Sequence, residues 1–170
     1  SKLNKNTSIN KILDFYTDNT STFSDYEKAI LTKYVNIIQK YINKNSLLNR
    51  FNWRFVKLNE NIEYGMPFTS GNLIFFSKLF LKNLKDKDKC LEIILHEKIH
   101  ICQRFYQELF DKFYEKYLNI EIIDNLDIGP YWNLYNFSNP DGIFVKYIYH
   151  DFKGNKFVPL LVNKENKLKK

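Results

Sequence analysis

Apolar residues recur at helical spacing in three stretches of the chain, at residues 9–16, 24–42 and 89–118. The second stretch opens with Ser24, which can form a capping box with Glu27. The third contains no glycine or proline, so we expect a single uninterrupted helix of about thirty residues there. The pattern therefore predicts helices at the start and in the middle of the chain.

A different spacing, of two residues, predicts strands. Aromatic and polar residues alternate over residues 51–55, and residues 73–76 form an apolar run after a loop at residues 64–72. Strong turn signals at Gly129-Pro130 and at residues 139–142 precede further aromatic-rich strand candidates. These late candidates are residues 144–149 and 157–162.

Helices and strands together predict an α+β fold. We expect one long helix packed on a small twisted sheet that contains both the early and the late strands, with additional N-terminal helices alongside. A length of 170 residues suits a single domain spanning residues 1–170. Residues 1–45 would form its helical N-terminal part, and residues 164–170 a charged tail.

Charge and cysteine content narrow the classes of partner and location. The net charge is +7, but arginine occurs only at Arg50, Arg54 and Arg104, so the positive charge is almost all lysine. Lysine attracts polyanions loosely, whereas reading of base sequence favours arginine. We expect at most a weak nucleic-acid or acidic protein partner, and coding bias explains lysine enrichment equally well. Two cysteines and no membrane-spanning apolar run favour a cytoplasmic protein with no membrane partner.

The long helix contains the sequence His96-Glu97-Lys98-Ile99-His100, which fits the pattern H-E-x-x-H. Residues four apart project from one helix face, so His96 and His100 can bind one Zn²⁺ ion. Glu97 lies about 100° around the helix, beside the metal, where a carboxylate can accept a proton from water. His150 is the only other histidine in the chain, so two histidines four residues apart favour a metal site over an ordinary amphipathic helix with two exposed histidines.

Other polar residues extend the same face of the helix. Glu92 and Gln103 lie on one stripe with the histidines, and an apolar flank covers the back of the helix. We expect Glu92 and Gln103 to support the metal ligands or to contact substrate in a cleft.

The segment from Leu95 to His100 resembles the active-site helix of the zincin metallopeptidases. Residues 73–76 resemble the sheet edge on which zincins hold their substrate, which implies substrate contact at Phe75. The combination of residues 65–69, the H-E-x-x-H helix and residues 139–142 is similar to uncharacterised zincin-like proteins of large DNA viruses. The resemblance implies a zincin-like fold, a zinc cofactor and cleavage of a peptide or protein substrate.

A catalytic zinc site needs a third protein ligand. The chain lacks the continuation typical of metzincins and is more similar to gluzincins, whose third ligand comes later in the sequence. Asp141, in the Asn-Pro-Asp-Gly turn, is the main candidate, and His150 is the alternative. Further acidic candidates are Glu121, Asp124, Asp127 and Asp151.

Two hypotheses of function follow. The first is a zinc metalloendopeptidase with Glu97 as general base. The second is a zincin-fold interaction protein of weak or absent activity, for example a component of a virus particle that binds an acidic or nucleic-acid partner.

Overall fold

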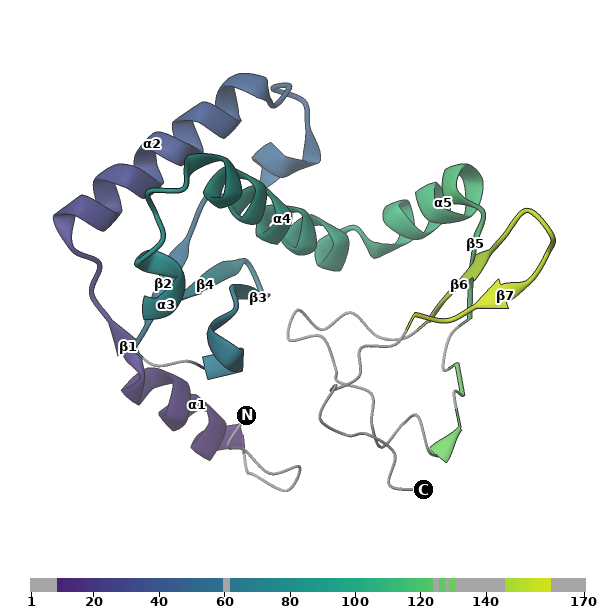
Figure 1. Cartoon of the computed structure of the whole chain (residues 1–170), viewed down its shortest axis with the longest axis horizontal. Helices are drawn as coiled ribbons and strands as arrows, with labels where there is room; N and C mark the ends of the chain where they lie inside the picture. The colour runs from purple at the N-terminus through teal and green to yellow at the C-terminus, as the bar shows by residue number, and fades with distance from the viewer. Residues whose placement is uncertain (1–8, 60–61, 124–125, 128, 131–145, 160–170) are drawn as a thin grey trace. The chain divides into compact units, whose positions relative to one another are not determined.

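The computed structural model describes residues 9–59, 62–123, 126–127, 129–130 and 146–159. Over these residues the fold is a mixed α+β fold with five α-helices and two small sheets (Figure 1). The chain divides into two compact units, Ser1–Phe105 and Tyr106–Lys170, and each is described by itself. The expectation that they form one domain stays a prediction.

The first unit is built around a mixed sheet with the strand order β1-β2-β4-β3. Its strands are β1 (Thr20–Ser21), β2 (Phe55–Leu58), β3 (Phe68–Ser70) and β4 (Leu73–Ser77). Strands β2 and β4 run parallel, whereas the β1–β2 and β3–β4 pairs are antiparallel. A tight turn at Gly71 (φ +54°) joins β3 to β4, and the left-handed backbone there favours glycine.

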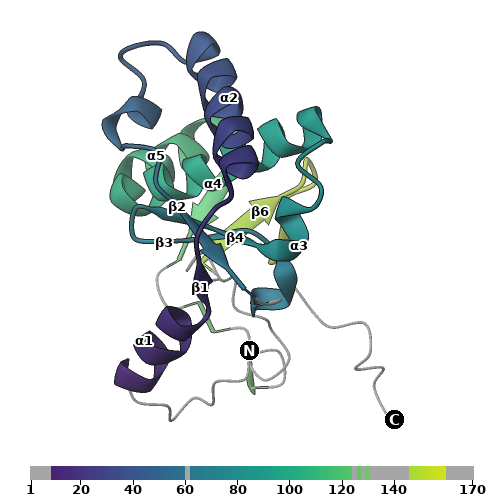
Figure 2. The same cartoon turned by 90° about the vertical axis from the view of Figure 1, so that its left-hand side faces the viewer.

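Helices cover both faces of this sheet (Figure 2). Helices α2 (Asp25–Tyr41) and α4 (Lys87–Phe105) lie on one face, where Ile74 and Phe76 of β4 are fully buried in the main core. Helix α1 (Ile9–Asp18) lies on the other face and packs Phe15 and Tyr16 against a smaller cluster. Alternate residues of β4 therefore serve two different cores.

Side-chain caps set the first residues of two helices, and the sequence predicts the one at Ser24. Ser24 accepts a hydrogen bond from the Glu27 amide at 3.2 Å, and Glu27 Oε2 accepts one from the Ser24 amide at 2.7 Å, so the capping box forms. Ser77 Oγ likewise accepts from the Phe80 amide and caps the short helix α3 (Lys78–Leu81). Short helical turns η1 (Leu47–Arg50) and η2 (Ile62–Gly65) complete the unit.

The predicted strand at residues 51–55 is wrong in position, because the strand begins only at Phe55. The carbonyl oxygens of Phe51 and Asn52 instead accept hydrogen bonds from Lys98 Nζ at 2.5 and 3.3 Å. The loop expectation for residues 64–72 is also partly wrong, since Phe68–Ser70 pairs with β4. The first difference depends on a partner distant in the sequence, Lys98, whereas the second follows from a hairpin between neighbouring strands.

The expected thirty-residue helix is two helices, α4 and α5 (Gln107–Leu118), interrupted at Tyr106 (φ −124°, ψ 40°). The end of α4 is attached to the first unit, where the Phe105 ring packs on Phe51 at 4.8 Å between centroids. Tertiary packing can therefore end a helix at a residue where the sequence has no glycine or proline.

The second unit contains a separate sheet with the order β5-β6-β7, formed by Ile120–Ile122, Tyr147–His150 and Lys156–Phe157. Tyr114 of α5 packs edge-on against Tyr147 of β6, with ring centroids 5.5 Å apart. Lys146 Nζ donates to Asp111 Oδ2 at 2.6 Å and fixes α5 to the same sheet. The late strands therefore do not join the first sheet, which corrects the single sheet that we expected.

Candidate metal centre

Helix α4 brings the two histidines of the motif together. Nε2 of His96 and Nε2 of His100 lie 2.9 Å apart, and the two ring planes are nearly perpendicular at 89°. This contact follows from local geometry, because residues four apart meet on one face of a helix. At 2.9 Å the two ring nitrogens are within hydrogen-bond distance of each other, on the one helix face from which a pair of imidazoles can bind a metal ion.

Gln103 contacts the ring of His100 at Nδ1, the nitrogen that does not face His96. Its Oε1 atom lies 2.6 Å from Nδ1 of His100, and an amide oxygen can only accept, so Nδ1 carries the hydrogen. In the neutral ring the lone pair is then on Nε2, the nitrogen that faces His96. A partner of this kind orients the ring and fixes its tautomer for metal binding.

Glu97 is placed at the border between the histidine face and the core face of α4. Its side chain is only 4% exposed, whereas the neighbouring His96 is exposed. Burial restricts the positions that the carboxylate can take, and Ile94 and Ile101 of the same helix are fully buried close to it. The motif thus combines two convergent imidazoles with a confined carboxylate.

Arg104 attaches this end of α4 to strand β3. Its guanidinium donates to the Gly71 carbonyl oxygen at 2.8 Å and to Thr69 Oγ1 at 2.9 Å. These bonds set β3 beside the helix that carries the histidines. Within the described residues β3 is one of the two edge strands of the sheet, β1 is the other, and β4 is internal between β2 and β3.

The sheet-edge expectation for residues 73–76 is therefore corrected, because β4 is internal and Phe68–Ser70 is an edge strand. Phe75 stacks on Phe68 at 4.8 Å between ring centroids and belongs to the cluster on the α1 face. Its neighbours Ile74 and Phe76 point to the α4 side. The structure does not bring Phe75 to the histidines, and we leave it out of the site. Glu92 is exposed on α4, one helical turn before His96.

The candidates for a third ligand lie in the second unit. Asp141, the main candidate, and Asp124 fall outside the described residues. Nε2 of His150 lies 3.0 Å from Glu121 Oε2, and Lys156 Nζ donates to the same oxygen at 2.7 Å. Hydrogen bonds from Lys156 above all, and from His150, hold the pKa of Glu121 below its ordinary value despite the opposing effect of burial.

The two remaining acidic candidates organise turns. Asp151 accepts hydrogen bonds from the backbone of Lys153 and Asn155, and Asp127 accepts one from the Gly129 amide. Among the residues that the structure describes, no three His, Cys, Asp or Glu side chains gather in a group that could hold a metal ion. The described part of the centre is the His96–His100 pair with its supporting residues.

Sequence reasoning did not single out Lys98 within the motif. Its side chain is fully buried, and its Nζ atom lies 4.6 Å from the centroid of the Trp53 ring. Burial lowers the pKa of Lys98 to about 8. A signal existed, because Lys98 lies between the apolar positions of the helical wheel, on the side opposite to His96. Its contacts fix α4 to the segment before β2.

Comparisons with protein-family models, with curated proteins and with solved structures gave no match. In the described part of the chain, no helix has the length and apolar character needed to cross a membrane. The centre therefore has to be interpreted from its own geometry.

Proposed function

We propose that this chain is a zinc-dependent metallopeptidase in which His96 and His100 bind the metal through Nε2 and Glu97 is the general base. The observation that carries the proposal is the convergence of the two Nε2 atoms at 2.9 Å, with Gln103 oriented on Nδ1 of His100. Imidazole is a preferred ligand of Zn²⁺, and the two nitrogens would move from 2.9 Å to about 3.3 Å apart to take adjacent corners of a tetrahedral site. Asp141 is the proposed third ligand.

Bound zinc would lower the pKa of a water molecule and polarise the carbonyl group of the substrate. Glu97 would accept the proton of the attacking water and pass it to the leaving amine. Its burial keeps the carboxylate close to its helix, and a confined base loses little freedom in the reaction. His96 and His100 would hold the metal ion without changing protonation state.

The open side of β3 would bind the substrate in an extended conformation. Within the described residues this strand pairs only with β4, so its other edge is available for a peptide. Arg104 fixes the end of the strand through Thr69 and Gly71 and keeps the edge at a constant distance from α4. Peptide and histidines would then lie on the same side of the unit.

Metal analysis combined with a cleavage assay tests this function. We expect about one zinc ion per chain and zinc-dependent cleavage of a denatured protein substrate. Glu97→Gln should retain zinc and reduce kcat by about 10²- to 10⁴-fold, the range for loss of a general base. Glu115→Gln, at an exposed position of α5, is the matched control and should be unchanged. Unchanged cleavage by Glu97→Gln would remove Glu97 from its proposed role.

A second candidate function is an interaction protein of zincin-like fold without catalysis. Its support is the net charge of +7, which attracts acidic partners and nucleic acid to the chain. Zinc binding without cleavage by the unmodified chain, together with salt-sensitive copurification of nucleic acid, would favour this candidate.

A further inference from the structure

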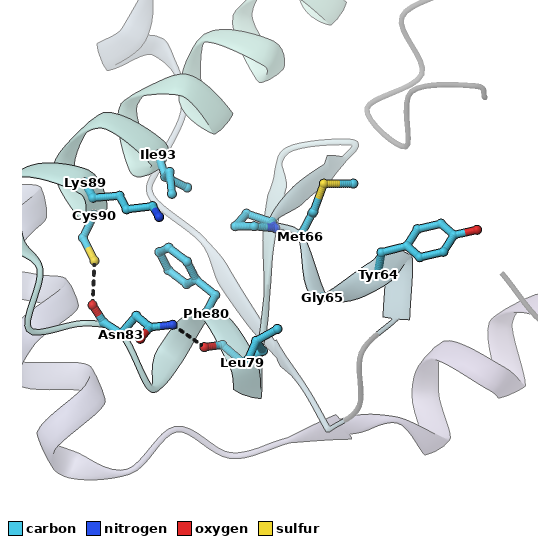
Figure 3. A pocket seen from close by; sticks show the side chains of 10 residues that line it. Tyr64, Gly65, Met66, Leu79, Phe80, Asn83, Lys89, Cys90 and Ile93 are labelled. Carbon is cyan, nitrogen blue, oxygen red and sulfur yellow. Dashed lines mark hydrogen bonds between the residues drawn. The ribbon is translucent and has the colours of Figure 1, made fainter. Parts of the chain in front are cut away.

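A pocket of about 240 Å³ opens on the first unit next to helix α4 (Figure 3). Its walls come from three segments, which are the stretch leading into β3, helix α3 with the turn after it, and the first half of α4. Met66, Phe80 and Ile93 make much of the lining apolar. A cavity of this kind suits an apolar group such as an amino-acid side chain.

The pocket and the histidine pair share one face of α4. Lys89 and Ile93 line the pocket, His96 follows Ile93 by three residues, and His100 follows His96 by four. Residues at this spacing are neighbours along one side of a helix, and three residues correspond to a rise of about 4.5 Å. A peptide bound at the histidines can therefore place a nearby side chain in the pocket.

The rim of the pocket exposes large apolar side chains. Tyr64 is 66%, Met66 48% and Leu79 47% exposed. The backbone of Glu63 and Tyr64 has left-handed φ values of 50° and 57°, which are costly for residues other than glycine. Ser77 Oγ, which donates to the Gly65 carbonyl oxygen at 2.7 Å, holds this conformation. An apolar rim held in a strained conformation is typical of a binding surface.

The charge at the pocket indicates a second property of its ligand, besides the apolar group. Lys89 is the only charged residue among the described residues that line the pocket. Figure 3 shows its side chain extending from α4 toward Phe80 and Ile93. The net charge of +7 attracts acidic ligands to the chain as a whole. A ligand with an apolar group and a carboxylate next to it is complementary to both features.

We propose that this pocket binds an apolar side chain of a peptide substrate in which acidic residues flank that side chain, with Lys89 contacting a flanking carboxylate. The inference rests on the proposed peptidase function, because it names the substrate class of that site. The binding step itself needs no metal, so it is measurable separately.

Met66 provides a direct probe, because it is the only methionine of the chain. The full chain, labelled with ¹³C in the methionine methyl group and kept free of metal, gives a single methionine signal from the pocket rim. Three acetylated and amidated tripeptides are titrated, with leucine between glutamates, serine between glutamates and leucine between lysines. We expect a saturable shift of the Met66 signal with the first, no shift with the second, and several-fold weaker binding of the third.

Two charge variants on α4 test the role of Lys89. Lys89→Glu should weaken binding of the glutamate–leucine–glutamate peptide by about two- to fivefold, the range for an exposed ion pair. Lys87→Glu changes an exposed lysine of the same helix outside the pocket lining and should leave binding unchanged. Equal weakening by both variants would overturn the assignment of Lys89.

The outcomes separate this inference from the proposed function. Zinc-dependent peptide cleavage with no Met66 shift for any tripeptide overturns the pocket and leaves the peptidase standing. A saturable, leucine-dependent shift in a chain that never cleaves peptides supports the pocket and overturns the peptidase. An equal shift with the serine peptide contradicts the apolar assignment.

Discussion

Side chains that are close together in the sequence of α4 have three different environments. His96 and His100 turn outward and meet, Glu97 is confined at the border of the core, and Lys98 is fully buried on the opposite side. Gln103 then fixes the His100 ring. The motif is therefore both the candidate metal centre and an anchor of the helix.

Replacing Gln103 should weaken metal binding without unfolding the protein. Gln103→Leu removes the acceptor for Nδ1 of His100, and loss of such a supporting partner typically costs 10- to 100-fold in metal affinity, here about 10-fold or more. Competition with a chromogenic chelator measures the change. Gln107→Leu, at an exposed position of α5, is the control and should bind zinc normally. Equal affinity of the two variants would show that Gln103 does not support a ligand.

Lys98 should make stability depend on pH in the alkaline range. Since burial lowers its pKa to about 8, the unfolded chain binds more protons than the folded chain between pH 8 and the ordinary lysine pKa of about 10.4. The free energy of unfolding therefore rises with pH in this window, by up to about 2 kcal/mol from pH 7 to 9.5. The contribution is absent below pH 8, where both states are protonated.

Urea denaturation at pH 7 and 9.5 measures this effect as the difference between the unmodified chain and Lys98→Met. Burial raises the pKa of Cys90 and of Cys102, which acts in the opposite direction. The Cys90 effect is common to both proteins, whereas the charge of Lys98 lowers the pKa of Cys102, so the difference reports Lys98 together with its interaction with Cys102. Lys87→Met, at an exposed position, should behave as the unmodified chain does. A pH response unaffected by Lys98→Met would contradict the lowered pKa.

Secondary-structure elements of the first unit are joined by a few polar contacts at their ends. Arg104 joins the end of α4 to β3, and Lys98 joins α4 to the segment before β2. At the start of α2, Glu27 forms the capping box and also accepts two hydrogen bonds from Lys57 of β2, at 2.8 and 2.9 Å. These contacts fix the helices that position the candidate site.

Glu27→Gln tests the contact between α2 and β2. Glutamine can keep the capping box but leaves the largely buried Lys57 ammonium without a charged partner, so we expect a loss of about 1–3 kcal/mol in the free energy of unfolding. Asp25→Asn removes an exposed ion pair with Lys28 and should cost about 0.5 kcal/mol. Thermal and urea denaturation measure both.

The same contact has a predicted pH dependence. Burial alone would raise the pKa of Glu27, but hydrogen bonds from Lys57 and Ser24 together lower it below its ordinary value. The contribution of Glu27 is present above the unfolded pKa of about 4.3 and is lost as the pH falls through the lower folded pKa. A Glu27→Gln loss that is as large at pH 3 as at pH 7 would contradict this assignment.

The histidine pair and its proposed third ligand belong to different units of the chain. His96 and His100 belong to the unit Ser1–Phe105, whereas Asp141 and His150 belong to Tyr106–Lys170. The first unit has its own apolar core, in which Ile74, Phe76 and Ile94 are fully buried. Folding and metal binding should therefore depend on different parts of the chain.

A fragment of residues 1–105 tests this separation. We expect it to fold with a cooperative urea transition because its core is internal to the unit. We expect its zinc affinity to fall by at least about 100-fold, since two ligands remain where a catalytic site uses three. Circular dichroism and chelator competition measure the two properties. A folded fragment that binds zinc as tightly as the full chain would exclude a third ligand from residues 106–170.

Local spacing was sufficient for the features that depend on neighbours along the chain. The capping box at Ser24 and the facing histidines follow from distances of three or four residues, and the strand at Leu73 follows from a short apolar run. Such geometry is set by the backbone of a single element, so the sequence predicts it without knowledge of the rest of the molecule.

Tertiary structure alone decided the features that depend on distant partners. The helix ends at Phe105, where its last turn packs on Phe51, and β4 is internal because β2 pairs with one side of it and β3 with the other. Lys98 lies buried because carbonyl groups far away in the sequence accept its hydrogen bonds. The sequence by itself determined that two imidazoles meet on one face of α4, because residues four apart on a helix are neighbours. Long-range packing determined the strand and the pocket beside that helix.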